Sequence, residues 1–301
     1  MTTLGLLAVA RNEGFILEEF FEHYIRQGVD HFYIVDNNST DNSFEIYEKY
    51  SSILTLKHEP KVMNLENVDE GDIQVPSYGK MYPEVTTEWL YICDVDEFAY
   101  ARRGYNTIKD FLIDKGHLFD QYLIKLKLFT DNGNILQPKS IIEGCTKRHD
   151  CSPLKKPISY PVKSISRTKK IRGLSIVNQR LTNSSITADG TLTHFYTKDH
   201  LTLDEVLTVR QVSEELYEQA YIVSNHYMYQ SKEYWDTVKV HRGRASRPII
   251  WHGEAKSYYE NQWSKLPKYP IKDDFELLNI TKNFKSQLAG PERIELPPTS
   301  S

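Results

Sequence analysis

Three acidic side chains stand close together in YICDVDEFAY (91–100), a run that otherwise has the apolar character of a buried strand. They are Asp94, Asp96 and Glu97. Alternate residues of a strand point the same way, so the two aspartates can direct their carboxylates at one point. Hard oxygen ligands of this kind suit Mg²⁺ or Mn²⁺, and a bound cation would also reduce the repulsion between the acids. The alternative is an exposed acidic turn.

A further acid, Asp36, ends the apolar stretch HFYIVD (31–36). It lies about 20 residues past the loop after the first apolar run, where an acid can bind a ribose hydroxyl or a base N–H. We therefore expect Asp36 to contact a nucleoside, and Asp41, in the polar stretch that follows, to cap the next helix. The stretch ARNEG (10–14) has a single glycine, which argues against a dinucleotide-binding loop.

Strands and helices must alternate to position these acids. Apolar runs predict strands, and helical spacing predicts helices between them; the strands are 4–10, 31–36, 53–59 and 89–96, and the helices 13–28, 44–50 and 78–85. This alternation is typical of βαβ units and a mainly parallel α/β sheet, in which ligands bind outside the carboxyl ends of the strands. Three such ends have polar residues, at 11–13, 36–41 and 94–97, which predicts one shared crevice.

The rest of the chain is less regular. The elements that we expect are a strand at 121–129, a hairpin around 187–196, a helix from Thr202 to about Tyr221 with a Thr202–Glu205 capping box, and a loop with an amphipathic helix over 225–244. Residues 147–172 hold nine Lys or Arg against one acid, whereas residues 59–98 hold ten acids against two Lys. The polar, proline-rich stretch 286–301 predicts a disordered tail.

Length and composition limit the class of protein. The 301 residues, 40% of them hydrophobic, suffice for one large domain or two small ones, and we expect one domain over 1–285. A net charge of −4 does not require a nucleic-acid partner. The three cysteines form no CxxC pair, which fits a reducing compartment. No run reaches about 18 apolar residues, so we expect no transmembrane helix and a soluble cytoplasmic protein, with peripheral membrane contact through 147–172 as an alternative.

Three blocks of the sequence resemble the GT-A glycosyltransferases: AVARNEGFILEEFFEHYIRQGVDHFYIVDNNSTDNS, WLYICDVDEF and NHYMYQSKEYWDTVKVHRG. More narrowly, they are similar to the family-2-like and family-92-like branch, with its KNE-type opening, D-N-x-S-x-D turn, DxDEF metal motif and late NHY signature. The match covers residues 4–244 in that order. LFTDNG (128–133) departs from the FG-containing stretch common in that branch, and nothing after about residue 285 matches it.

The resemblance implies a GT-A fold with a nucleotide-binding half over 1–100 and an acceptor-binding half over 101–285. The residues that it assigns to the nucleotide pocket are Ala10, Arg11, Glu13, Asp36 and Asp94. Asp96 would be the direct metal ligand, and Asp94 would lie near the ribose or the metal. These enzymes often add a late histidine to the metal shell, and both His194 and His226 are candidates that the sequence does not separate.

The implied activity is metal-dependent, inverting transfer of a sugar from a UDP- or GDP-sugar to a hydroxyl of a glycan or glycoconjugate acceptor, with Mn²⁺ or Mg²⁺ as cofactor. Such a reaction needs a general base, and the candidates are Glu143, Asp131 and Glu97. It also needs positive charge near the leaving diphosphate, and the candidates are Lys163, Arg167 and Lys169. A solvated surface position explains each of these six residues as well.

Two rival functions are a sugar-phosphate nucleotidyltransferase and a non-catalytic carbohydrate-binding module. The first also uses acids at strand ends and a metal, but it more often has a glycine-rich phosphate loop near the first strand, which ARNEG lacks. The second would not need the DxD motif, Asp36 and a late histidine together.

Overall fold

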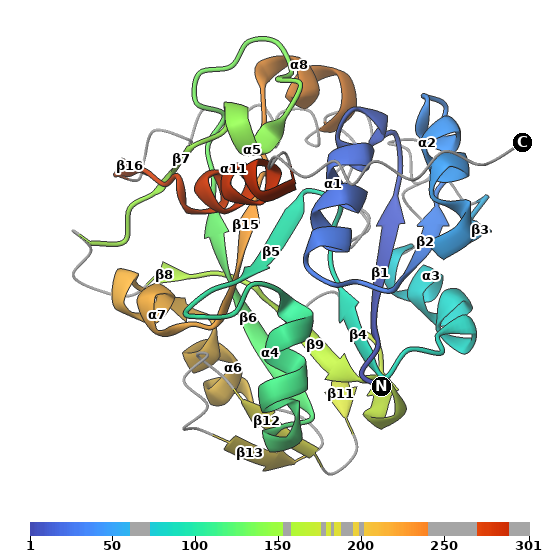
Figure 1. Cartoon of the computed structure of the whole chain (residues 1–301), viewed down its shortest axis with the longest axis vertical. Helices are drawn as coiled ribbons and strands as arrows, with labels where there is room; N and C mark the ends of the chain where they lie inside the picture. The colour runs from blue at the N-terminus through green and yellow to red at the C-terminus, as the bar shows by residue number, and fades with distance from the viewer. Residues whose placement is uncertain are drawn as a thin grey trace, which may run out of the picture.

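The computed structural model describes residues 1–60, 73–152, 158–175, 179–181, 184–187, 195–198, 202–239 and 270–288. Its centre is a ten-stranded mixed sheet (Figure 1). In sheet order the strands are β13 (Phe195–Lys198), β12 (Ser184–Thr187), β6 (Gln121–Leu128), β9 (Val162–Arg167), β4 (Trp89–Ile92), β1 (Leu4–Ala10), β2 (His31–Asp36) and β3 (Leu54–His58), while β15 (Ile222–His226) pairs with β6 and with β5 (Glu97–Ala101). The expected α/β architecture is confirmed.

The four strands expected in the first hundred residues are present. β4, β1, β2 and β3 run parallel to one another, so their carboxyl ends lie at the same edge of the sheet. The fourth strand is shorter than expected, because β4 ends at Ile92 and the acids after it lie in a turn. β9 and β5 run antiparallel to their neighbours β4 and β15, which makes the sheet mixed.

Helices cover both faces of the sheet, and the alternation of side chains along β1 shows why. Leu4, Leu6 and Ala8 belong to the larger core cluster, together with the apolar face of α1 (Gly14–Arg26), whereas Leu7 belongs to a second cluster on the opposite face with α3 (Gln74–Met81). A strand that is apolar at successive positions can pack on both faces in this way. On the larger-cluster side lie also α2 (Ser43–Lys49) and α4 (Ile108–Lys115).

Smaller elements complete the described chain. The short strands are β7 (Lys147–His149), β8 (Ile158–Ser159), β10 (Ile171–Gly173), β11 (Arg180–Leu181), β14 (Gln211–Val212) and β16 (Ile271–Asp273). The remaining α-helices are α5 (Ile141–Gly144), α6 (Leu203–Val209), α7 (Glu214–Gln219), α8 (Lys232–Tyr234) and α11 (Glu276–Leu288). Single 3₁₀ turns are η1 (Ser51–Ile53), η3 (Tyr82–Glu84), η4 (Gly116–Leu118) and η5 (Thr168–Lys170), and η6 (Trp235–Lys239) is a π-helical turn.

The less regular half departs from expectation in two places. The capping box of Thr202 and Glu205 is present, but the helix it opens ends at Val209, and β14 separates it from α7. The expected hairpin exists as the antiparallel pair β12 and β13, although the residues that connect the two strands lie outside the described ranges. The stretch predicted as a disordered tail begins within α11, and residues 289–301 lie outside the described ranges.

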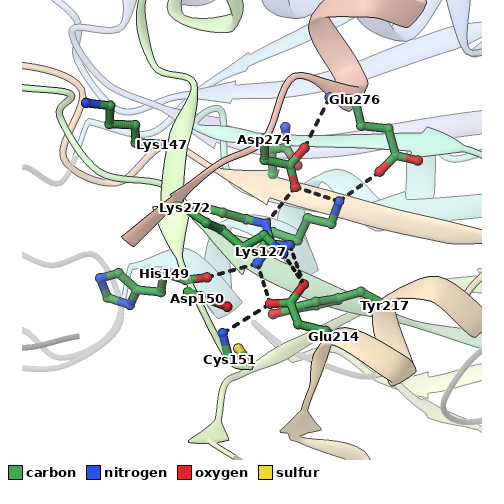
Figure 2. A network of polar contacts seen from close by, with 12 residues as sticks. Lys127, Lys147, His149, Asp150, Cys151, Glu214, Tyr217, Lys272, Asp274 and Glu276 are labelled. Atoms are coloured by element: carbon green, nitrogen blue, oxygen red, sulfur yellow. Dashed lines mark hydrogen bonds and ion pairs between the residues drawn. The ribbon is translucent and has the colours of Figure 1, made fainter. Parts of the chain in front are cut away.

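A network of buried charges joins the C-terminal segment to the sheet (Figure 2). The Lys127 ammonium of β6 lies 3.0 Å from an Asp274 oxygen and 2.9 Å from a Glu276 oxygen. Arg148 of β7 donates to Asp274 and, through two nitrogens, to Glu214 of α7. Residues 270–288 are therefore an integral part of the fold. No helix in the described ranges is long and apolar enough to cross a membrane.

Candidate active site at the strand ends

The strand ends that we expected to share a crevice are neighbours at one edge of the sheet. Ala10 at the end of β1 pairs with Asp36 at the end of β2, so the polar residues after both strands are neighbours. Ile92 at the end of β4 pairs with Ser164 of the antiparallel β9, which places Lys163 beside the residues after β4. β15 adds its own carboxyl end, where His226 pairs with Glu97.

We call Cys93–Glu97 the acidic turn. Its two aspartates do not point at one site as alternate residues of a strand would. The Asp94 carboxylate accepts hydrogen bonds from Gln74 Nε2 at 2.5 Å and from Lys163 Nζ at 3.0 Å. Its side chain is 39% exposed, so it still faces the crevice. Gln74 was not foreseen from the sequence, because nothing in QVPSYGKM marks one polar residue of a helix as a partner of a distant acid.

Glu97 is buried behind Asp94 and stabilises the turn. Its Oε2 accepts from the Asp94 backbone N–H at 3.2 Å and lies 3.3 Å from Lys163 Nζ. Burial raises the pKa of Glu97 to about 7, against the opposing effect of Lys163. The side chain is only 1% exposed, so an acceptor could not reach it without a rearrangement.

Asp96 faces two cationic groups from the second half of the chain. One carboxylate oxygen lies 2.8 Å from Lys239 Nζ and the other lies 3.5 Å from His226 Nε2. Burial alone would raise the pKa of this carboxyl group, but Lys239 and His226 outweigh burial and hold the pKa far below its ordinary value. For His226, burial lowers the pKa, and Asp96 more than offsets it, so the pKa is raised. Asp96 is therefore a buried, ionised carboxylate.

The donor set around Asp96 fits a divalent cation. A carboxylate oxygen and an imidazole nitrogen are ligands that Mn²⁺ accepts, and this pair comes from two strand ends that share the crevice. Within the described ranges, no group of three or more His, Cys, Asp or Glu side chains has the geometry to hold a metal. A cation on Asp96 and His226 would therefore need further ligands from substrate oxygens and water, as Mg²⁺ and Mn²⁺ at phosphate sites commonly do. His194, the other histidine candidate, lies outside the described residues.

The predicted nucleotide-site residues gather at the ends of β1 and β2. Ala10 and Glu13 are buried, and Arg11 is partly exposed with a pKa that burial lowers and Asp36 raises. The Asp36 carboxylate is completely buried, and its oxygens accept from the Ser39 backbone N–H at 2.9 Å and from Tyr47 Oη at 3.2 Å. In this structure Asp36 therefore shapes the loop after β2.

Two further side chains bind the loops after β1 and β2 to each other. Asn12 Oδ1 accepts from the Thr40 backbone N–H at 2.7 Å, and the backbone N–H of Asn12 donates to Ser39 Oγ at 2.9 Å. Asp41 accepts from the backbone N–H of Gly14 at 2.8 Å and of Ser43 at 3.1 Å, the first residues of α1 and α2. The N-cap residue of α2 is Asn42 rather than the predicted Asp41, and Asp41 instead joins the starts of the two helices.

The candidate bases other than Glu97 lie beyond the end of β6. Asp131 follows Leu128, which pairs with His226, so it lies on the same side of the sheet as that histidine. Burial raises the pKa of Asp131 while the side chain stays partly exposed. Glu143 is exposed on α5, whose N-cap is Ser140.

The three candidate phosphate-binding residues are not brought together. Lys163 is in the crevice, but Arg167 pairs with Trp89 at the opposite end of β4, about 13 Å farther along the strand. There its guanidinium stacks at 4.4 Å over the Trp89 ring and donates to Glu88 at 2.6 Å. Lys169 follows in η5 and is exposed at that same end. Lys163 and Arg167 are four residues apart on β9, so they share a face of the sheet but lie toward opposite ends of the strand.

No family model and no curated protein matches this chain. Among solved structures, S. aureus TarS 1–349 is similar at 20% identity over 56% of this chain and 47% of that chain, with a TM-score of 0.34. Mycobacterium tuberculosis glucosyl-3-phosphoglycerate synthase, solved with Mn²⁺ and UDP, is similar at 14% identity over 42% and 44%, with a TM-score of 0.28. Mannosyl-3-phosphoglycerate synthase from Rubrobacter xylanophilus is similar at 11% identity over 44% and 43%, with a TM-score of 0.31.

The chain spans less than half the length of each of these three structures. TM-scores this low do not establish a common fold over the chain. The side chains at the strand ends, rather than these likenesses, support the function that follows.

Proposed function

We propose that this chain is a GT-A-type glycosyltransferase that is metal-dependent and inverting. It would move a sugar from a UDP- or GDP-sugar to a hydroxyl of a glycan or glycoconjugate acceptor. The observation that carries the proposal is the buried Asp96 carboxylate, which lies 3.5 Å from His226 Nε2 where the ends of β4 and β15 meet. Because desolvation is costly, a buried carboxylate needs a cationic partner or a metal, and Asp96 has an imidazole within reach as a second ligand.

Asp96 and His226 are the residues that would hold Mn²⁺ or Mg²⁺. When bound, the cation supplies positive charge that stabilises the leaving diphosphate. Lys163 pairs with both Asp94 and Glu97, and Asp94, the more exposed of these two acids, would face the ribose. The linked loops after β1 and β2 would orient the nucleoside through their backbone and through Arg11.

Asp131 is the general base that the geometry favours among the three candidates. Glu97 is enclosed by Lys163 and the turn, whereas Asp131 is partly exposed and comes three residues after Leu128, which pairs with His226. A raised pKa makes a carboxylate a stronger base toward an acceptor hydroxyl. Glu143 is the second candidate, and comparison of Asp131→Asn with Glu143→Gln in a transfer assay would choose between them.

The test is a panel of UDP- and GDP-sugars, with hydrolysis and transfer followed with and without Mn²⁺. Thermal stabilisation by UDP or GDP is measured in parallel. Asp96→Asn should lose at least 100-fold in turnover, the size of effect expected when charge stabilisation of the leaving group is removed. Asp114→Asn, which alters an exposed carboxylate on α4, is the matched control. If no nucleotide raises the melting temperature and Asp96→Asn behaves like Asp114→Asn, the proposal is wrong.

A further inference from the structure

Each acid of the acidic turn faces a lysine from a distant part of the chain. Lys163 Nζ lies 3.0 Å from Asp94 and 3.3 Å from Glu97. Lys239 Nζ lies 2.8 Å from Asp96, on the oxygen that does not face His226. The protein's own ammonium groups thus offset most of the negative charge of the turn, so the turn does not depend on a bound cation alone.

The two lysines are held in different ways. Lys163 stands on β9 between β4 and β6, its side chain is 4% exposed, and it serves two carboxylates at once. Lys239 is the last residue of the π-helical turn η6, its side chain is 14% exposed, and it forms an ion pair with Asp96. Its ammonium also lies 5.7 Å from the centre of the Tyr234 ring. The Lys239 side chain is thus less enclosed than the Lys163 side chain and has more room to move.

We propose that Lys239 is an exchangeable cation: a divalent ion that binds Asp96 and His226 displaces the Lys239 ammonium, while Lys163 remains in place. This inference rests on the proposed function, because it describes how the charge of the proposed metal site is compensated before a metal binds. It assigns the two lysines of the site separate roles, one permanent and one replaceable.

The physical reason is charge. In the metal-free protein the ammonium compensates Asp96, which would otherwise be a buried carboxylate with only His226 beside it. When a divalent ion arrives at the same carboxylate, ammonium and metal repel each other at a few ångströms in a site of low dielectric constant. The flexible lysine stem allows the ammonium to leave while the backbone stays where it is. The lysine therefore lowers the affinity for the metal and stabilises the protein without it.

The first measurement is the affinity for Mn²⁺ alone, by calorimetry, with no nucleotide present. Lys239→Met should bind Mn²⁺ about tenfold more tightly than the wild type, because the competing charge is gone. Lys239→Arg keeps the charge and should stay near the wild type. Lys232→Met is the matched control, since it removes the same charge from the same segment but from an exposed pair with Asp236. Saturating Mn²⁺ should raise the melting temperature of Lys239→Met more than that of the wild type.

The second measurement uses the unmodified protein, so it does not depend on a variant that folds. Acetylation of lysines is followed by mass spectrometry with and without Mn²⁺. Lys239 should react several-fold faster once Mn²⁺ displaces it, whereas the exposed Lys232 serves as an internal reference and should not change.

The outcomes separate this inference from the proposed function. Equal Mn²⁺ affinity in Lys239→Met and the wild type, unchanged acetylation of Lys239, or no Mn²⁺ binding at all would overturn the exchange, even in a protein that turns over a nucleotide sugar. Tighter Mn²⁺ binding by Lys239→Met and faster acetylation of Lys239 with Mn²⁺, without turnover of any nucleotide sugar, would support the exchange. The same result would contradict the proposed glycosyltransferase activity.

Discussion

At the residue scale, the charge of the site depends on which ammonium group faces which acid. Asp94 and Asp96 are two residues apart in sequence, yet their partners come from β9 and from η6. The turn after β4 separates the two carboxylates, so each has its own environment: Asp94 is partly exposed and Asp96 is buried. This division suits a site in which one acid faces the substrate and the other holds a cation.

Replacement of Lys163 by Met should destabilise the protein strongly. The change leaves Glu97 buried without its cation, and breaking a buried pair in this way typically costs about 3–5 kcal/mol. The measurement is urea unfolding of the metal-free protein. Lys169→Met, an exposed lysine at the other end of β9, is the control and should lie within about 0.5 kcal/mol of the wild type. Equal stability of the two variants would contradict the role given to Lys163.

At the element scale, the site depends on two loops that are hydrogen-bonded to each other. Asn12 has φ of 53°, a left-handed conformation that asparagine tolerates better than most residues. In that conformation its side chain reaches Thr40 across the crevice. The backbone conformation of Asn12 and its amide side chain therefore join the loops after β1 and β2.

Replacement of Asn12 by Ala should weaken nucleotide binding several-fold and also cost stability. The variant loses the acceptor for the Thr40 N–H and adds strain of about 1 kcal/mol, because alanine disfavours the left-handed region. Asn12→Gly separates the two effects, since it loses the same hydrogen bond without the strain. Calorimetric titration with UDP or GDP and thermal unfolding report on each. Wild-type affinity in Asn12→Gly would show that the Asn12 side chain does not position the nucleotide loop.

At the scale of the whole molecule, residues 270–288 are joined to the sheet by the charged network of Lys127, Arg148, Glu214 and Asp274 (Figure 2). Asp274 bridges Lys127 and Arg148, and its side chain is 6% exposed. β16 pairs with β7 beside this network, so strand pairing and ion pairs act on the same segment. The C-terminal segment and the end of β6, after which Asp131 lies, should therefore lose stability together.

Replacement of Asp274 by Asn should destabilise the protein by about 3 kcal/mol at neutral pH, because two buried cations lose their shared carboxylate. Burial opposes ionisation, but Lys127 and Arg148 lower the pKa of Asp274 to about 2 from its ordinary 3.8. A depressed carboxylate pKa stabilises the fold above pH 3.8, and that contribution, about 2 kcal/mol, is lost as the pH falls toward 2. The difference in the free energy of unfolding between the wild type and Asp274→Asn should therefore become smaller in acid.

The control for this prediction is Asp273→Asn, the exposed neighbour on β16, for which unfolding curves should follow the wild type at every pH. Unfolding by urea between pH 7 and pH 3 gives the comparison. If the difference in the free energy of unfolding between the wild type and Asp274→Asn stays constant with pH, ionisation of Asp274 is not what joins the segment to the sheet.

The sequence by itself determined the parallel half of the sheet and the edge at which its polar residues gather. Strands such as LGLLAVA and HFYIVD are apolar throughout because both faces are covered, and this leaves a strong local signal. The order of strand and helix then requires that the strand ends share one edge. Asp36, Asp94 and Asp96 could therefore be placed near one edge of the sheet from the sequence, and the polar stretch with Asp41 could be read as the start of a helix because such signals are local.

Only the tertiary structure decided the partners of those acids, because each partner is far away in the chain. Lys163 and Arg167 belong to one basic segment, and they lie toward opposite ends of β9. Lys239 meets Asp96 across 143 residues of sequence, and Asp274 meets Lys127 across 147. Charge interactions depend on distance in space, and distances of this kind arise only when separate elements pack, so no local pattern carries them.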